Sequence, residues 1–337
     1  MVFLFFAKKW DQTYTFLKHF TKREQKMDKN TITPSNETLY AAPAFAEAAP
    51  EKHSLLFKIW RVLYPLFIFV GVQIAGSIVL IIVYAVTVII PQLNQPGGTV
   101  DMTQLTDWVI GKSLILALAC DLVVIPVFAF LYIRQIKGQK KQTISSFKIT
   151  DYLLVAALAI AADFAVTYIL IGFNLVQYFP DYQTIMSGIT GNSFILQIAA
   201  VGIIAPIAEE FLMRGVILNR LLGYVRVLPA VLIQAVLFGV LHMNILQGTY
   251  AAVLGILMGY IYIKYGSLLM TIIFHITLNT LSVCLPETFA EGVNPFYILI
   301  PALILTGFIL WLINHRGDSV MFYSNRKLEK VPEEAGE

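Results

Sequence analysis

About eight long apolar runs constrain this chain more than any other feature of its sequence. Each run is close to the ~20 residues that an α-helix needs to cross the hydrocarbon core of a bilayer. Only 13% of the 337 residues are charged and 58% are hydrophobic, which excludes a disordered chain, a coiled coil and an ordinary soluble enzyme. We therefore predict an all-α fold, a polytopic membrane helical bundle with about eight transmembrane helices. The runs lie at residues 62–90, 109–133, 152–175, 193–218, 228–243, 249–263, 267–285 and 295–313.

The basic residues alternate between the connections that join these runs. Lysine and arginine gather before the first run, in every second connection after it and behind the last run. The connections around 91–108, 176–192, 244–248 and 286–294 contain neither. Cytoplasmic loops of membrane proteins carry the excess of lysine and arginine, so both termini are predicted to be cytoplasmic. The net charge of +3 is too small to indicate binding to nucleic acid.

Three parts of the chain differ in composition. Residues 1–60 form a predicted cytoplasmic segment, whose mixed aromatic and basic beginning suits an amphipathic helix on an anionic membrane surface and whose end resembles a flexible linker. An alternative is that translation starts at Met27. Residues 61–315 form the predicted transmembrane domain, with a catalytic core at about 190–285, and residues 316–337 form a cytoplasmic tail.

The fourth apolar run contains three charged side chains in the sequence APIAEEFLMRG. An ionisable group in the middle of a bilayer is costly, so each one is a functional candidate with a partner to be found. Glu210 and Arg214 stand at positions i and i+4, where a carboxylate and a guanidinium on one helix meet. Glu209 projects about 100° around the helix from its neighbour and is left for a different partner.

Two further apolar runs carry polar side chains at the same helical spacing. The fifth run ends in FGVLHMN, with Phe238 and His242 one turn apart, and the seventh contains FHITLN, with His275 and Asn279 on one face. Estimated from a rise of 1.5 Å per residue, the two histidines and the asparagine all fall inside the hydrocarbon core, as Glu209 does. We therefore predict that the three runs share one site.

These segments resemble the ordered motifs of a known family. EEFLMR (Glu209–Arg214), FGVLH (Phe238–His242) and HITLN (His275–Asn279) are similar to the motifs EExxxR, FxxxH and HxxxN of the CPBP family. That family contains the CAAX proteases, with Ras-converting enzyme among them, and the bacterial Abi proteins linked to bacteriocin processing and immunity. The resemblance covers roughly residues 190–285 and implies an intramembrane glutamic endopeptidase.

The residues themselves suit this chemistry. Hydrolysis of a peptide bond needs a base that activates water, donors for the developing oxyanion and a proton for the leaving amine. The resemblance implies that Glu209 and His242 activate water and that His275 and Asn279 stabilise the oxyanion, without a metal or another cofactor. The supporting residues are Glu210, Arg214 and Phe238.

Other functions remain open at this stage. Two carboxylates and two histidines from separate helices would also serve as zinc ligands, although the chain lacks HExxH. Asp121 and Asp163 lie in the second and third runs, but their contexts lack the YD and GxGD motifs of aspartyl intramembrane proteases, which favours helix packing or a water cavity. Serine or cysteine catalysis has little support. A non-catalytic immunity or scaffold protein and a proton-coupled transporter are the non-proteolytic alternatives.

The expected partners follow from the same resemblance. The substrate would be a peptide or a lipidated peptide that reaches the site from the cytoplasm or laterally from the lipid bilayer, and no nucleic-acid partner is expected. The sequence leaves the oligomeric state open. Short loops and the absence of an organellar targeting signal favour a multi-pass protein of a bacterial plasma membrane, with the endoplasmic reticulum as the alternative.

Overall fold

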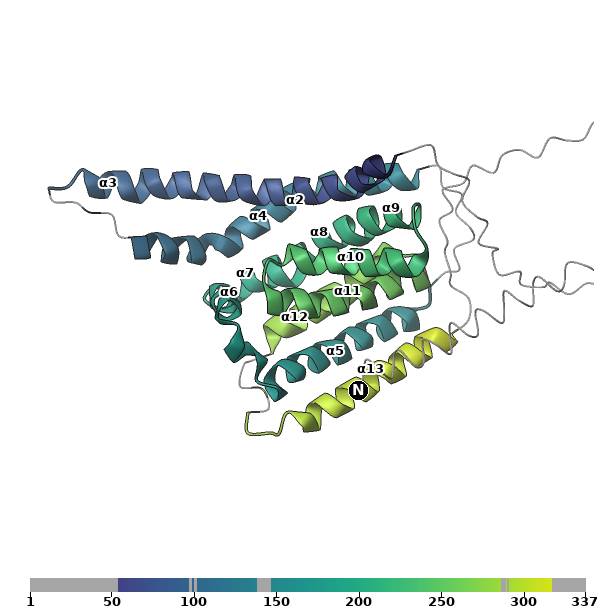
Figure 1. The fold of residues 1–337 in the computed structure, drawn as a ribbon. Helices are drawn as coiled ribbons and strands as arrows, with labels where there is room; N and C mark the ends of the chain where they lie inside the picture. Colours follow the sequence, from purple (N-terminus) through teal and green to yellow (C-terminus); the bar gives the residue numbers. More distant parts are fainter. Residues whose placement is uncertain are drawn as a thin grey trace, which may run out of the picture. The chain divides into compact units, whose positions relative to one another are not determined.

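The computed structural model describes residues 54–96, 99, 102–137, 147–285, 289 and 291–316, all within one compact unit, His53–Glu337. Every regular element in these ranges is helical, as the sequence predicts (Figure 1). The predicted N-terminal amphipathic helix, its linker, the possible start at Met27 and almost all of the C-terminal tail lie outside the described residues.

Six described helical segments are long and apolar enough to cross a membrane, and two more are apolar but shorter. Each of the eight apolar runs in the sequence corresponds to one of these segments. The count of eight crossings and the cytoplasmic termini stay predictions. The six long segments are Leu55–Leu93, Thr103–Ile136, Ile149–Gly172, Phe194–Leu222, Ile245–Tyr265 and Phe296–His315, and the two shorter ones are Val227–Leu241 and Leu268–Cys284.

The first half of the bundle contains three long segments and a short connection. Pro65 and Pro126 lie inside long helices, where a bilayer protein tolerates proline because its neighbours satisfy the freed carbonyl groups. The elements are α2 (Leu55–Tyr84), the π-helix η1 (Ala85–Ile89), α3 (Ile90–Leu93), α4 (Met102–Ile136), α5 (Ile149–Gly172), the 3-10 helix η2 (Leu175–Tyr178) and α6 (Pro180–Thr190).

The fourth long segment is a continuous helix of mixed type. Two π-helical stretches interrupt it, and the sequence pattern did not predict them. Its elements are α7 (Phe194–Gln197), η3 (Ile198–Ile204), α8 (Ala205–Glu210), η4 (Phe211–Leu218) and α9 (Asn219–Leu222). Pro206 lies inside this continuous helix, so its missing amide hydrogen leaves a carbonyl of the preceding turn without a helical donor. π-helical turns are frequent at functional sites, so the two carboxylates at the end of α8, between two such stretches, are functional candidates.

The remaining helices are α10 (Val227–Leu241), α11 (Ile245–Tyr265), α12 (Leu268–Cys284) and α13 (Phe296–His315). The turn between α10 and α11 is sharp because Met243 adopts a left-handed φ of 52°. The side chain of Asn244 then caps α11 by accepting a hydrogen bond of 3.0 Å from the Gln247 amide. Gly266, with φ 59°, ends α11 in the left-handed conformation that glycine adopts without steric cost.

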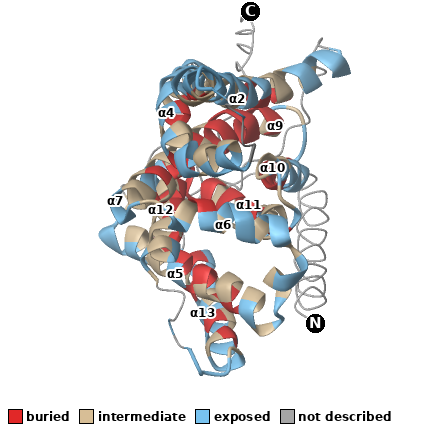
Figure 2. Ribbon diagram, turned by 90° about the vertical axis from the view of Figure 1, so that its left-hand side faces the viewer, coloured by how far each residue is buried: buried red, intermediate tan, exposed pale blue. Residues whose placement is uncertain are grey.

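The core lies where α10, α11, α12 and the fourth segment pack together, and α5 covers α12 from the other side (Figure 2). Close approach depends on small residues. A Cβ atom at Gly239 on α10 would lie 2.5 Å from the carbonyl oxygen of Gly248 on α11, so the two backbones touch. α13 packs on α5 and α2 packs on α4, and their outward faces carry exposed apolar side chains.

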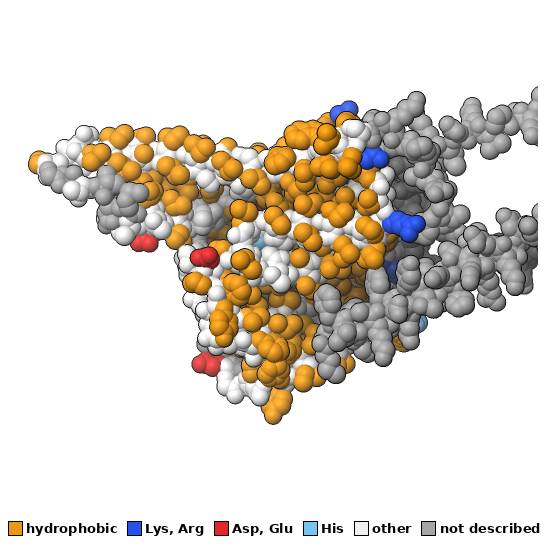
Figure 3. All heavy atoms as spheres, in the orientation of Figure 1, with side chains coloured by type: hydrophobic (Ala, Val, Ile, Leu, Met, Phe, Trp, Pro, Cys, Tyr) orange, Lys and Arg blue, Asp and Glu red, His pale blue; other side chains and the backbone are white. Residues whose placement is uncertain are grey.

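Charged side chains separate towards opposite ends of the helices (Figure 3). At the end that we call the basic end, Arg220 donates to the carbonyl of Arg61, and Arg316 forms a 3.2 Å ion pair with Asp151. At the other end, which we call the acidic end, Asp181 lies in the first turn of α6. Between them, the visible surface is covered with hydrophobic side chains, as a lipid-facing surface requires.

Candidate active site

Two neighbouring carboxylates stand at the junction of α8 and η4. Glu210 is completely buried, whereas the side chain of Glu209 retains 21% of its surface. The junction gives adjacent residues of one helix opposite environments, because one side chain points into the bundle and the other to its margin. Of the two, Glu209 is the carboxylate that a bound molecule can reach.

Arg214 neutralises the buried carboxylate. Its Nη1 lies 2.7 Å from Oε1 of Glu210, and both side chains are fully buried. Its Nη2 donates to the carbonyl of Gly255 at 3.3 Å, and its guanidinium carbon lies 4.9 Å from the ring centroid of Phe238. The ion pair predicted from the i, i+4 spacing is therefore present. A buried pair of this kind fixes geometry more than it adds stability.

His275 joins the two carboxylates. Its Nδ1 lies 2.9 Å from Oε1 of Glu210, and its Nε2 lies 3.6 Å from Oε2 of Glu209. An ionised carboxylate only accepts hydrogen bonds, so the contact with Glu210 places a hydrogen on Nδ1 and directs Nε2 towards Glu209. The distance of 3.6 Å is too long for a direct hydrogen bond and is of the size at which a water bridge is expected.

His242 reaches the site through an aromatic ring. It caps the C-terminus of α10, and its Nδ1 lies 2.9 Å from the carbonyl oxygen of Phe238. The ring of Phe238 stands edge-on to both histidines, with centroids 4.9 Å from His242 and 5.9 Å from His275. The structure thus brings His242 against Phe238, which also contacts His275, and the role of His242 beside Glu209 stays a prediction.

Asn279 lies one turn beyond His275 on α12. Its side-chain amide donates to the carbonyl of Val201 at 3.0 Å, and the neighbouring Thr280 donates to the carbonyl of Gly202 at 3.3 Å. Both carbonyls belong to the π-helix η3, and Pro206, which stands five and four residues after them, has no amide hydrogen to donate to either. Asn279 therefore ties α12 to η3 beside the catalytic candidates.

Sequence reasoning missed two parts of this arrangement. The first is Gly255, whose carbonyl accepts from Arg214; the spacing of Gly255 and Gly259 in α11 was the available signal for a close helix approach. The second is the pair of π-helices, for which the sequence offers no recognised signature. Glycine lets α11 come close enough for its backbone to bind the guanidinium.

The two aspartates of the second and third runs lie apart from each other. Asp121 on α4 accepts a 3.2 Å hydrogen bond from Gln73, and Asp163 on α5 accepts one from Ser282. Both are buried. Among the residues that the structure describes, no three His, Cys, Asp or Glu side chains are grouped in a way that would hold a metal ion.

Comparison with known proteins bears on this arrangement directly. The model of the family described as type II CAAX prenyl endopeptidase Rce1-like matches residues 191–281, the stretch that contains every residue of the site described above. This segment is therefore similar to a domain of that endopeptidase family. It includes η3, α8, η4, α10, α11 and most of α12, and the described part of the chain has six helical segments long and apolar enough to cross a membrane. No curated protein and no solved structure matched the chain.

Proposed function

We propose that this protein is an intramembrane endopeptidase of the glutamic type, in which Glu209 activates the attacking water. One observation carries the proposal. Glu209 is the accessible carboxylate of an adjacent pair, and His275 links it to a buried partner, Glu210, whose charge Arg214 neutralises. Environments that differ this much are the usual way in which two carboxylates acquire separate roles.

The proposed reaction begins with a water molecule between Glu209 and His275. Glu209 takes a proton from this water as its oxygen attacks the carbonyl carbon of the scissile peptide bond. The oxyanion that forms is stabilised by donors from one face of α12, the Asn279 amide and the His275 ring, which donates from Nε2 when both of its nitrogens carry a proton, and His242 assists Glu209 in holding the water. The carbon–nitrogen bond then breaks, and the proton held by Glu209 passes to the leaving amine.

The residues around Glu209 hold this arrangement in place. Glu210 accepts from Nδ1 of His275 and so orients the opposite ring nitrogen, while Arg214 and the edge-on ring of Phe238 restrict the rotation of the same imidazole. A catalytic histidine held in one orientation loses little entropy as the transition state forms. The supporting residues thus act on His275 and not on the substrate.

The proposed substrate is a peptide or lipidated peptide in a bacterial plasma membrane. Its proposed entry to Glu209 is from the lipid or from the basic end, and the excess of lysine and arginine supports a cytoplasmic position for that end. The family match favours CAAX-type ends, and bacteriocin-type peptides are the second candidates.

The test compares purified wild type with Glu209→Gln in lipid nanodiscs, using one prenylated and one unprenylated CAAX peptide and mass spectrometry of the products. Loss of a general base lowers the rate by about 10²-fold or more. Asp151→Asn is the matched control, because it replaces another acid by its amide at the exposed ion pair with Arg316. It should cleave like wild type.

Two results would redirect the assignment. Full cleavage by Glu209→Gln would remove Glu209 from the base role, and absence of cleavage by wild type, with biological rescue by the variant, would favour the immunity or scaffold function. Loss of wild-type activity with 1,10-phenanthroline and its recovery with zinc would establish the zinc alternative. Comparison of new peptide termini in deletion strains expressing each variant would identify the natural substrate.

A further inference from the structure

Asp163 on α5 has one carboxylate oxygen that no described residue donates a hydrogen bond to. The residue is only 3% exposed, one oxygen accepts a hydrogen bond from Ser282, and the other oxygen, Oδ2, has no hydrogen-bond partner among the described residues. A buried carboxylate oxygen without a donor is costly, and an ordered water is the usual donor in such a place. The proposed catalytic groups do not include Asp163, so its chemistry needs a separate explanation.

Ser282 connects Asp163 with the candidate active site. His275, Asn279 and Ser282 stand at positions i, i+4 and i+7 of α12 and therefore share one face of the helix. With a rise of 1.5 Å per residue, Ser282 lies about 10 Å along the helix from His275, towards the acidic end. Polar side chains thus continue beyond the catalytic candidates in one line.

Two tyrosine hydroxyls, those of Tyr250 and Tyr182, are further polar groups in the neighbourhood of Asp163. Tyr250 on α11 lies within electrostatic range of the Asp163 carboxylate. Its hydroxyl interacts with that of Tyr182 on α6 by a side-chain hydrogen bond, and the two rings meet edge to face with centroids 6.4 Å apart. A hydroxyl both donates and accepts, so these two groups are able to hydrogen-bond to water that approaches Asp163.

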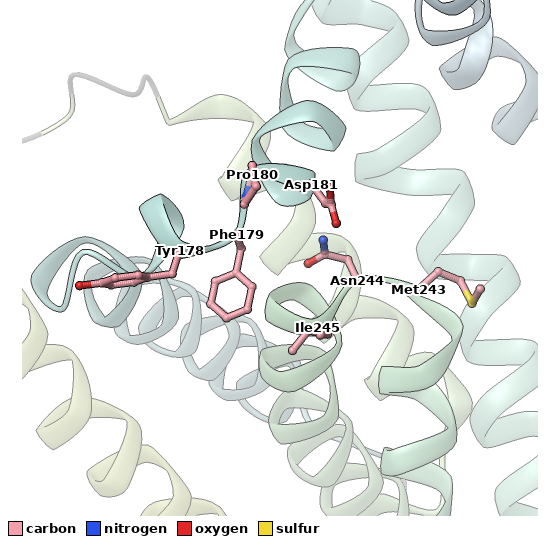
Figure 4. Close-up of a pocket in the computed structure, with 7 residues that line it drawn as sticks. All are labelled: Tyr178, Phe179, Pro180, Asp181, Met243, Asn244 and Ile245. Carbon is pink, nitrogen blue, oxygen red and sulfur yellow. The ribbon is translucent and has the colours of Figure 1, made fainter.

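A cavity of about 280 Å³ lies at the acidic end, and Asp181, the residue before Tyr182, belongs to its lining (Figure 4). It lies between the start of α6 and the turn that joins α10 to α11. The side chains of Asp181 and Asn244 face one another there, and Tyr182 is the next residue after Asp181. The lining residues are Tyr178, Phe179, Pro180, Asp181, Met243, Asn244 and Ile245. A cavity of this size holds several water molecules.

We propose that Asp163 binds water within a polar path that leads from this cavity, past Tyr182 and Tyr250, to the His275 and Asn279 face of α12. Its function would be to supply the water that a hydrolase consumes inside a membrane. The proposal rests on the proposed proteolytic function for its purpose, but the path itself is a separate physical claim. It predicts that a side chain at position 163 is reached by water from the acidic end.

The test measures this access without using proteolysis. Asp163→Cys and Ala162→Cys are made in a chain whose native thiols are replaced by Cys120→Ala and Cys284→Ser. Ala162 is the matched control, because it is the neighbouring residue on α5 and is 4% exposed. Sealed vesicles are treated with a membrane-impermeant, hydrophilic methanethiosulfonate. Met243→Cys, exposed at the acidic end, and Arg226→Cys, exposed at the basic end, report which side the reagent reaches.

We expect Asp163→Cys to react in the vesicles in which Met243→Cys reacts, and Ala162→Cys to react at least about 10-fold more slowly, because a hydrated thiolate is the nucleophile that attacks these reagents. The proposal would be overturned if the two cysteines were labelled equally or if Asp163→Cys were not labelled. It would also be overturned if Asp163→Cys reacted in vesicles in which Met243→Cys does not. Labelling after denaturation confirms that each thiol is present.

A kinetic arm then tests the purpose of the path. Asp163→Asn keeps a polar group for water and should cleave like wild type, whereas Asp163→Leu should lower kcat about 10-fold with KM unchanged. If wild type has no protease activity but the labelling pattern holds, the path stands and the proposed function fails. If cleavage depends on Glu209 but Asp163→Cys is not labelled, the proposed function stands and the water path fails.

Discussion

The two neighbouring glutamates show how residue-scale environment divides chemical roles. Glu210 is completely buried and contacts Arg214 and His275, while about a fifth of the Glu209 side-chain surface is exposed. A carboxylate that pairs with a cation and accepts from a ring N–H is a poor base, because both interactions stabilise its ionised form. The partly exposed neighbour retains the freedom to accept a proton.

The buried ion pair leads to a prediction that separates stability from catalysis. Arg214→Met alone leaves an unpaired buried carboxylate and should cost about 3–5 kcal/mol in the free energy of unfolding. The double variant Glu210→Gln, Arg214→Met removes both charges and should recover most of that loss. It should still fail to cleave peptide, because His275 loses its ionised acceptor. Denaturant unfolding and peptide cleavage, measured on the same preparations, check the two halves.

Recovery of activity in the double variant would contradict the positioning role of the pair. Failure to recover stability would instead show that Glu210 and Arg214 contribute through packing, since Arg214 also lies over the ring of Phe238.

At the scale of the helices, irregular turns and close contacts place the site. The π-helices η3 and η4 flank α8, and the carbonyls of Val201 and Gly202 in η3 accept from side chains of α12. Each π turn shifts the helix face relative to a regular α-helix, so it decides which of Glu209 and Glu210 points inward. Helix packing then brings α12 to that face.

The contact between α10 and α11 predicts a sharp dependence on side-chain size. Gly239→Ala would place a methyl group 2.5 Å from the carbonyl oxygen of Gly248 and should destabilise the protein by about 1–3 kcal/mol, with loss of the register of His242. Gly307→Ala on α13 is the control, because nothing lies within 4 Å of the added atom. Thermal unfolding in detergent checks both. Equal stability of the two variants would refute the close contact.

Arg220 provides a second prediction at this scale, because it holds three helices together at the basic end. It is buried, donates to the carbonyl of Arg61, to the Tyr64 hydroxyl at 2.6 Å and to Gln135 at 3.4 Å, and stacks over the Tyr64 ring. Arg220→Gln should cost about 2 kcal/mol of stability, because one amide cannot satisfy acceptors on both α2 and α4.

The matched control for this clamp is Arg226→Gln, at an exposed arginine in the turn that follows α9. Its stability should equal that of wild type in the same denaturant titration. A similar loss in both variants would mean that the net positive charge of the basic end, and not the Arg220 contacts, stabilises the bundle.

For the whole molecule, the separation of charge predicts its orientation. The basic end should face the cytoplasm, with both chain termini on that side and eight crossings between them. Green fluorescent protein fused after residue 226 or at the C-terminus should fluoresce in a bacterial host, because it folds in the cytoplasm. Alkaline phosphatase fused after Asn244 should be active, because it requires the opposite compartment. Activity of both reporters on one side would show that α10 does not cross the membrane.

The sequence by itself determined much of this protein. Apolar runs of spanning length require helices in lipid, because each helix satisfies its own backbone hydrogen bonds. The i, i+4 spacing determined the pairing of Glu210 with Arg214, since two residues four apart on a helix are neighbours in any fold. The three motifs, taken together, indicated the CAAX protease family, which the match to residues 191–281 supports.

Only the tertiary structure decided how these groups meet. Spacing within a helix says nothing of contacts between helices, so the sequence could not show that His275 bridges both glutamates, that Phe238 packs on His275, or that Asn279 binds η3. The π turns and the unsatisfied oxygen of Asp163 depend on the packing of several helices at once. Local pattern fixes what one helix presents, whereas long-range packing decides what each side chain faces.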